Sequence, residues 1–258
     1  MMTTEQTIYK MNQMKLYNMA EKYQQLISNP QYRDLMLEEG VAYLIDAELT
    51  GRENRKRIRL LQQAHLRYPA HIEEIDYQSR RTLDKGRMLD LSELKWVKHK
   101  QNILVHGPTG VGKSYIISAL GSKCCEDGIS VYYIRTPKLL DEINQSRGTA
   151  SYLNYLKKLA RYQVLIIDDL GIAPLNKKES ADFLDIVEDR YQLSSLIISS
   201  QFPFENWYRL FSDETIADAI CDRLFHNAYK LQISGDSMRK DTTSKTAAND
   251  PVKDLVKP

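Results

Sequence analysis

A chain of 258 residues with 42% hydrophobic residues is long enough for one large or two small domains with a substantial core. The formal net charge of +2 excludes a polycation, so any surface for nucleic acid must be local. Three cysteines, Cys124, Cys125 and Cys221, exclude a disulfide framework and predict reduced, buried thiols. The chain begins without a signal-peptide pattern and contains no apolar run of membrane-spanning length, so we expect a cytoplasmic protein that makes no membrane contact.

The first 70 residues predict a small all-α domain. Apolar residues recur at helical spacing over residues 8–26, where Asn29-Pro30 ends the pattern, and again over residues 35–49. Residues 52–59 carry five cations and one anion and predict a helix with a basic face, which Pro69 ends. The cations are Arg52, Arg55, Lys56, Arg57 and Arg59, with Arg80 and Arg81 further along the chain. A solvated helix surface is the alternative interpretation of this charge.

Residues 71–240 predict an α/β domain. A connector with a short helix near Leu89–Lys98 comes first. From residue 101, short apolar runs alternate with helical segments, which predicts a parallel sheet flanked by helices. The runs are 102–106, 129–134, 164–168, 195–200 and a last one near 229–233. Residues 241–258 are polar and poor in large apolar groups, so we expect a disordered tail.

A phosphate-binding loop follows the first apolar run. Residues 107–114 read Gly-Pro-Thr-Gly-Val-Gly-Lys-Ser, with four residues between the outer glycines and then Lys-Ser. Glycines let the backbone present N–H groups to phosphate oxygens, Lys113 reaches the outer phosphates, and Ser114 offers a hydroxyl to Mg²⁺. A glycine-rich turn without a ligand is the alternative. The candidate nucleotide contacts are Gly107, Pro108, Thr109, Gly110, Val111, Gly112, Lys113, Ser114 and the next residue, Tyr115.

Polar residues also follow two later apolar runs. Val164–Ile167 precedes Asp168 and Asp169, where Asp168 is a candidate for the Mg²⁺ shell and Asp169 for polarising an attacking water. Leu196–Ser199 precedes Ser200 and Gln201, which would face the terminal phosphate if this strand lies between the other two. Each run could instead be a strand that ends in a solvated turn.

Arg223 is the candidate cation for phosphoryl transfer. It lies in Ile220–Phe225, after a helical pattern and before the last strand, where it could reach the nucleotide of a neighbouring subunit. An intramolecular salt bridge to Asp218 or Asp222 is the alternative. Arg239 is a weaker candidate for a second phosphate sensor.

These residues resemble, from about Met11 to Arg239, the IstB-type ATPases, which are AAA+ proteins that help insertion sequences transpose and are related to DnaC-type helicase loaders. The resemblance is carried by Ala47-Glu48-Leu49, Arg52-Glu53-Asn54-Arg55, Gly107–Ser114, Ile167–Gly171, Ser200–Pro203, Trp207-Tyr208, Ala217–Leu224 and Gly235–Lys240. It implies ATP and Mg²⁺ as cofactors, Asp169 as the catalytic carboxylate and Arg223 as an arginine finger. Most AAA+ proteins have Asp-Glu where this chain has Asp168-Asp169, so slow hydrolysis is implied.

The resemblance also implies partners: double-stranded DNA bound through phosphates with little sequence preference, a transposase, and other copies of the chain with ATP at their interfaces. Three alternatives stay open. A helicase loader would bind a ring helicase and prefer single strands; a small-molecule kinase would need an acceptor pocket under a lid; a scaffold would bind ATP without turnover and would not need Asp169.

Overall fold

The computed structural model describes residues 3–77 and 82–238, so Arg80, Arg81, Arg239 and the expected tail 241–258 lie outside the described residues. The chain falls into two compact units that divide between Leu60 and Leu61. From the sequence we had placed this boundary after residue 70.

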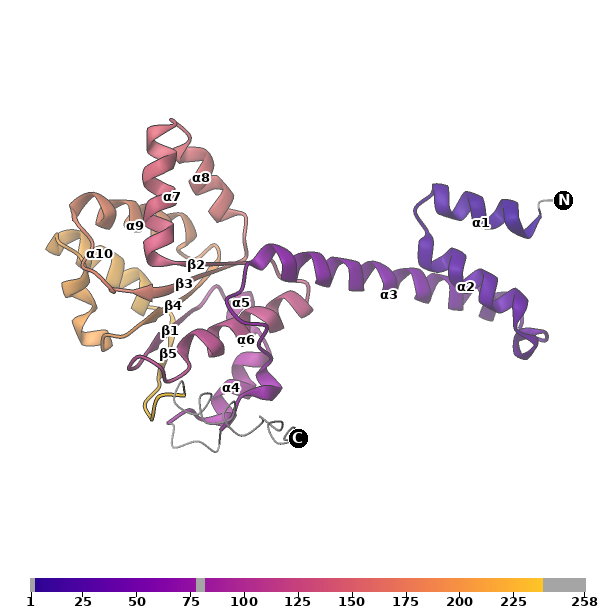
Figure 1. Ribbon diagram of the computed structural model, residues 1–258, viewed down its shortest axis with the longest axis horizontal. Coiled ribbons are helices and arrows are strands. Elements are labelled where there is room, and N and C mark those ends of the chain that lie inside the picture. The colour runs from indigo at the N-terminus through magenta and orange to yellow at the C-terminus, as the bar shows by residue number, and fades with distance from the viewer. Residues whose placement is uncertain (1–2, 78–81, 239–258) are drawn as a thin grey trace, which may run out of the picture. The chain divides into compact units, whose positions relative to one another are not determined.

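The N-terminal unit contains α1 (Thr4–Gln13), α2 (Tyr17–Ser28), the short 3₁₀ helix η1 (Pro30–Tyr32) and most of α3 (Leu37–Ala64) (Figure 1). The single helix predicted over residues 8–26 is two helices, because Lys15 takes a left-handed conformation with φ of 60° and breaks the repeat. Conversely, the patterns at 35–49 and 52–59 form one helix of 28 residues, since no proline interrupts them.

Polar contacts hold α2 to α3. Glu48 of α3, whose side chain is 5% exposed, accepts hydrogen bonds from the backbone N–H groups of Asn18 (3.0 Å) and Met19 (3.1 Å) in the first turn of α2. A carboxylate at this end of a helix satisfies N–H groups that have no partner within the helix. Gly51 lets α2 approach, because a Cβ atom there would lie 2.1 Å from the Asn18 Oδ1 atom.

The C-terminal unit is built on a five-stranded sheet in which every neighbouring pair is parallel, in the order β2-β3-β4-β1-β5. The strands are β1 (Asn102–His106), β2 (Val131–Arg135), β3 (Val164–Leu170), β4 (Ser195–Ser200) and β5 (Ala228–Gln232). The α/β class and all five predicted strands are confirmed. Successive side chains along a strand point to opposite faces of the sheet. A continuous apolar run therefore supplies apolar side chains to both faces, as a sheet covered on both sides requires.

Helices and short 3₁₀ segments precede and connect these strands. They are η2 (Ile72–Glu74), α4 (Lys85–Ser92), α5 (Lys95–Lys98), α6 (Lys113–Glu126), α7 (Thr136–Gly148), α8 (Tyr152–Ala160), α9 (Lys177–Arg190), η3 (Phe204–Leu210) and α10 (Glu214–Phe225). The short helix predicted near Leu89–Lys98 is therefore two helices, separated by Leu94 in a left-handed conformation. A capping box between Asn176 and Glu179 starts α9.

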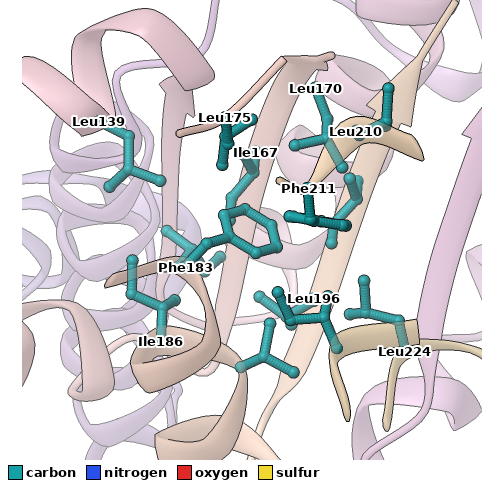
Figure 2. Close-up of a cluster of buried hydrophobic side chains, with 14 of the residues drawn as sticks. Leu139, Ile167, Leu170, Leu175, Phe183, Ile186, Leu196, Leu210, Phe211 and Leu224 are labelled. Carbon is teal, nitrogen blue, oxygen red and sulfur yellow. The ribbon is translucent and has the colours of Figure 1, made fainter. Parts of the chain in front are cut away.

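One face of the sheet is covered by α7, α8, α9, α10 and η3. Leu196 of β4 and Ile167 of β3 meet Phe183 of α9 and Leu224 of α10 in a single apolar cluster (Figure 2). The opposite face carries α6, where a Cβ on Gly121 would lie 2.9 Å from Ile166 of β3. Both layers leave the carboxyl ends of β1, β3 and β4 at one edge of the sheet, where ligands bind in open parallel sheets.

The prediction of buried, reduced cysteines is confirmed by the same layers. Cys124, Cys125 and Cys221 are buried and free, and burial raises the pKa of the Cys125 and Cys221 thiols to about 12. These thiols therefore stay protonated at neutral pH. Within residues 3–77 and 82–238, no helix is long and apolar enough to cross a membrane.

Candidate functional site

The loop 107–112 joins β1 to α6 and has the backbone shape of a phosphate cradle. Gly110 and Gly112 take left-handed conformations with φ of 89° and 94°, which glycine adopts without steric cost. Gly107 is required for a different reason, because a Cβ there would lie 2.1 Å from the carbonyl oxygen of Ile233. The loop leads directly into the N-terminus of α6. The free N–H groups and the dipole at this helix end favour an anion.

Lys113, the first residue of α6, lies over this loop and is only 6% exposed. Its Nζ atom donates to the carbonyl oxygens of Gly107 (2.6 Å) and Pro108 (2.9 Å). A buried ammonium group held by the loop beside a helix N-terminus favours a polyanion such as phosphate at this end of the sheet. The predicted loop residues are thus brought together.

The acidic pair lies on a bulge in β3. Pairing between β3 and β4 shifts after Ile167, and Asp169 takes a left-handed conformation with φ of 63°. In a regular strand two consecutive side chains point to opposite faces, whereas a bulge re-aims them. Here both carboxylates reach the same guanidinium: the Oδ2 atoms of Asp168 and Asp169 lie 3.6 and 3.5 Å from the Nη1 atom of Arg67.

Asp168 is fully buried and its oxygens already have donors. The Tyr133 hydroxyl of β2 donates to Oδ2 at 2.6 Å, while Ser199 Oγ of β4 and the Asp169 N–H donate to Oδ1. Burial, followed by the Asp168 charge, raises the pKa of Tyr133, so its hydroxyl remains a donor. These donors fix the orientation of the carboxylate.

Asp169 is less buried, with 14% of its side chain exposed, and is held by arginines. Nε of Arg135, at the end of β2, lies 2.9 Å from its Oδ2 atom, and Arg67 approaches the same oxygen. Four residues around the acidic pair were not predicted from the sequence: Arg67, Arg135, Tyr133 and Ser199. Arg135 and Tyr133 could have been found from their place on the strand next to β3, but nothing in the sequence pattern pointed to Arg67.

The strand after the acidic pair lies where we expected, since β4 separates β3 from β1. Gln201 contacts the loop, because its Oε1 atom accepts a hydrogen bond from Thr109 Oγ1 at 2.8 Å. Ser200 is buried and bonds the carbonyl oxygen of Leu170 (2.8 Å), so its hydroxyl stabilises the turn after β3. Ser199 is the serine that touches the acids.

Tyr115 faces away from the loop toward the segment before β1. Its hydroxyl donates to Glu74 of η2 at 3.1 Å, and its ring lies 6.1 Å from that of Tyr68. The residues next to Glu74 line a hollow of about 670 Å³, together with one side of α4. Its apolar lining residues are Ile72, Ile75, Tyr77 and Leu89.

Arg223 lies near the amino ends of the strands, whereas the loop lies at their carboxyl ends. It lines a small pocket with Lys100, with Asn102 at the start of β1 and with Leu196 near the start of β4. Its guanidinium pairs with Glu188 of α9 at 2.6 Å, so an intramolecular ion pair exists, although not with Asp218 or Asp222. Arg223 therefore cannot serve the loop of its own chain.

The cations of α3 do not all lie on one side. Arg52, Arg55, Lys56 and Arg59 recur at spacings of three and four residues and share a face, whereas Arg57 points elsewhere. All five are exposed. Arg52 and Arg55 also bond the Glu48 carboxylate, at 2.9 and 3.2 Å, and keep about half of each side chain exposed.

The donor set fits a magnesium nucleotide. Hydroxyl and carboxylate oxygens from Ser114 and Asp168 are hard ligands of the kind Mg²⁺ prefers, and they lie beside a phosphate-binding loop. Ser114 Oγ and Asp168 Oδ2 both approach the Arg67 Nη1 atom, at 3.5 and 3.6 Å, so they converge on one point.

Comparison with known proteins agrees with this geometry. The sequence profile of the family described as "IstB-like ATP binding protein" matches residues 9–246. The chain is 39% identical over 245 residues, which are 95% of this chain and 100% of the relative, to a protein of Sinorhizobium fredii (strain NBRC 101917 / NGR234) named as an insertion sequence ATP-binding protein, y4pL. Among solved structures, DnaI matches with a TM-score of 0.55 and 21% identity over 69% of this chain and 92% of DnaI, and the DnaC helicase loader with 0.52 and 19% over 64% and 97%. These likenesses show that the chain shares its fold, a parallel sheet flanked by helices, with DnaI and the DnaC helicase loader.

Proposed function

Since the chain belongs to the IstB-like ATP-binding protein family, we propose that it is an ATP-dependent DNA-binding protein that assembles on duplex DNA and helps a partner transposase. ATP binds at the loop 107–114 and is hydrolysed slowly, and its pocket is completed by Arg223 of a neighbouring copy. The nucleotide therefore controls assembly, because a ligand held between two copies stabilises the assembled state.

The observation that carries this proposal is that the loop and Arg223 lie at opposite ends of the same strand. The loop follows the carboxyl end of β1, and Arg223 lies with Asn102 at the amino end of the same strand. In a head-to-tail arrangement of identical subunits, the carboxyl ends of the strands in one copy can face the amino ends of the strands in the next copy. A cation delivered in this way stabilises the charge that builds on the transferred phosphoryl group.

The chain's own residues then have separate roles. Lys113 and the loop N–H groups hold the phosphates, while Ser114 and Asp168 hold Mg²⁺, with Asp168 acting directly or through water. Bound Mg²⁺ would neutralise phosphate charge during transfer. Asp169 orients the attacking water once its carboxylate is turned toward the nucleotide. We assign Gln201, which accepts a hydrogen bond from Thr109 of the loop, to the terminal phosphate.

The basic face of α3 is the proposed DNA contact. Arg52, Arg55, Lys56 and Arg59 suit phosphates spaced along a double helix, and contacts of this kind position a protein without reading sequence. Binding should weaken steeply with salt through counterion release. Glu48 fixes Arg52 and Arg55 against α2, so the face is ordered before DNA arrives.

Sedimentation velocity with labelled duplex DNA tests the proposal. We expect Mg·ATP to produce larger species and to tighten DNA binding. Lys56→Ala should weaken DNA binding and reduce the salt slope by about 1, whereas Arg57→Ala, which removes one cation from another side of the same helix, should have little effect. Oligomer size and DNA affinity that ignore nucleotide would contradict the proposal.

The likeness to DnaI and DnaC keeps a helicase loader as the second candidate. The full-length match to an insertion sequence protein favours transposition. Tighter binding to single strands than to duplex, together with capture of a ring helicase, would favour the loader.

A further inference from the structure

Arg67 lies among the three oxygens that we assign to the metal site and its catalytic neighbour. Its Nη1 atom is 3.5 Å from Ser114 Oγ, 3.6 Å from Asp168 Oδ2 and 3.5 Å from Asp169 Oδ2. A single guanidinium nitrogen nearly equidistant from all three oxygens is placed as a counter-ion of the whole group. No arginine elsewhere in residues 3–77 and 82–238 is recorded in contact with all three.

We propose that Arg67 competes with Mg²⁺ for this position, so that binding of the metal–nucleotide complex displaces its side chain. This inference rests on the proposed nucleotide function. Mg²⁺ bonds oxygen at about 2.0–2.1 Å in a near-ideal octahedron. A metal that Ser114 Oγ and Asp168 hold, directly or through water, needs the volume that Nη1 fills, and two cations at this separation repel each other.

The surroundings of Arg67 allow it to leave. Its side chain is 30% exposed, whereas that of Asp168 is fully buried. The Arg67 guanidinium also lies 5.5 Å from the Tyr68 ring, which offers an adjacent cation–π contact. Arg135 still pairs with Asp169 when Arg67 moves, so the acidic pair keeps one organic cation.

The residues on either side of Arg67 pack against α6 of the nucleotide-binding unit. Leu66 packs against Gly121 of α6. A Cβ atom added at Gly121 would lie 2.7 Å from the Leu66 side chain. Tyr68 contacts Tyr115, the residue after Ser114. Arg67 follows the end of α3 by three residues, so it lies in the segment that leads from the basic helix into the nucleotide-binding unit.

The experiment is a Mg²⁺ titration of the full chain, with a fluorescent ATP analogue at fixed concentration. Arg67→Gln removes the competing charge, and we expect the half-saturating Mg²⁺ concentration to fall about fivefold, as for loss of one partly exposed ion pair. Arg67→Lys, which keeps the charge, should stay near the wild type. Arg161→Gln, a surface arginine on the same unit, is the matched control and should not change the titration.

Thermal unfolding without nucleotide gives an independent readout. Arg67→Gln in chelator should melt below the wild type, because the acids lose a counter-ion, and Mg²⁺ alone should raise its melting temperature more than that of the wild type. An unchanged or higher Mg²⁺ requirement in Arg67→Gln would overturn the proposal. Nucleotide binding weakened equally with and without Mg²⁺ would also overturn it and would instead make Arg67 a phosphate ligand. A wild type that binds no nucleotide would sink the proposed function itself, which is a distinguishable failure.

Discussion

Tyr133→Phe removes one hydroxyl that contacts the acidic pair and leaves the aromatic ring in place. That hydroxyl donates to the fully buried Asp168 carboxylate at 2.6 Å. Hydrogen bonds to charged groups contribute about 1.5–3 kcal/mol, and we expect a loss of about 2 kcal/mol because Ser199 and a backbone N–H remain on the other oxygen. For a unit of this size, that loss corresponds to a fall in melting temperature of about 4–8 °C.

Differential scanning calorimetry measures this change, and the neighbouring residue supplies the control. The Tyr132 hydroxyl makes no hydrogen bond to the residues that the structure describes, and its ring stacks on Tyr162 at 5.0 Å. Tyr132→Phe should therefore melt within about 1–2 °C of the wild type, the scale of a surface substitution. Equal melting temperatures for the two variants would refute the assignment of Tyr133 as a donor that matters to Asp168.

Three further predictions concern the loop and the N-terminal unit. Lys113→Ala should abolish ATP-analogue binding in a fluorescence titration, because the cation that faces the outer phosphates is lost; ATP-dependent assembly by this variant would contradict its role. Gly107→Ala should also lose binding and lower the melting temperature, since its Cβ would overlap the Ile233 carbonyl oxygen. Burial alone would raise the Glu48 pKa, but Arg52 and the N–H groups of Met19 and Asn18 outweigh burial and lower it below 4.5. The stability from Glu48 is therefore present above pH 4.5 and lost as pH falls through the lowered pKa, so Glu48→Gln should cost about 1–2 kcal/mol at pH 7 in urea unfolding and progressively less as the pH is lowered below 4.5.

The sequence allowed the sheet and the phosphate loop to be predicted because both depend on local patterns. Four apolar residues before Asp168 specify a buried strand, and glycine spacing specifies the loop. Helix ends were predicted less well: Lys15 breaks a helix through a backbone conformation that its residue type does not signal. Arg67 and Ser199 could not be predicted, because their contacts with the acidic pair depend on a bulge and on chain packing between residues far apart in sequence.

The most direct test of the central claim mixes two inactive variants. Arg223→Ala keeps an intact loop, and Lys113→Ala keeps an intact arginine at the opposite edge of the sheet. If the nucleotide pocket is shared between copies, some junctions in the mixture join a good loop to a good arginine, and phosphate release with duplex DNA should recover to a clear fraction of the wild-type rate. A mixture that remains as inactive as its separate components, although sedimentation shows that they co-assemble, would contradict the account.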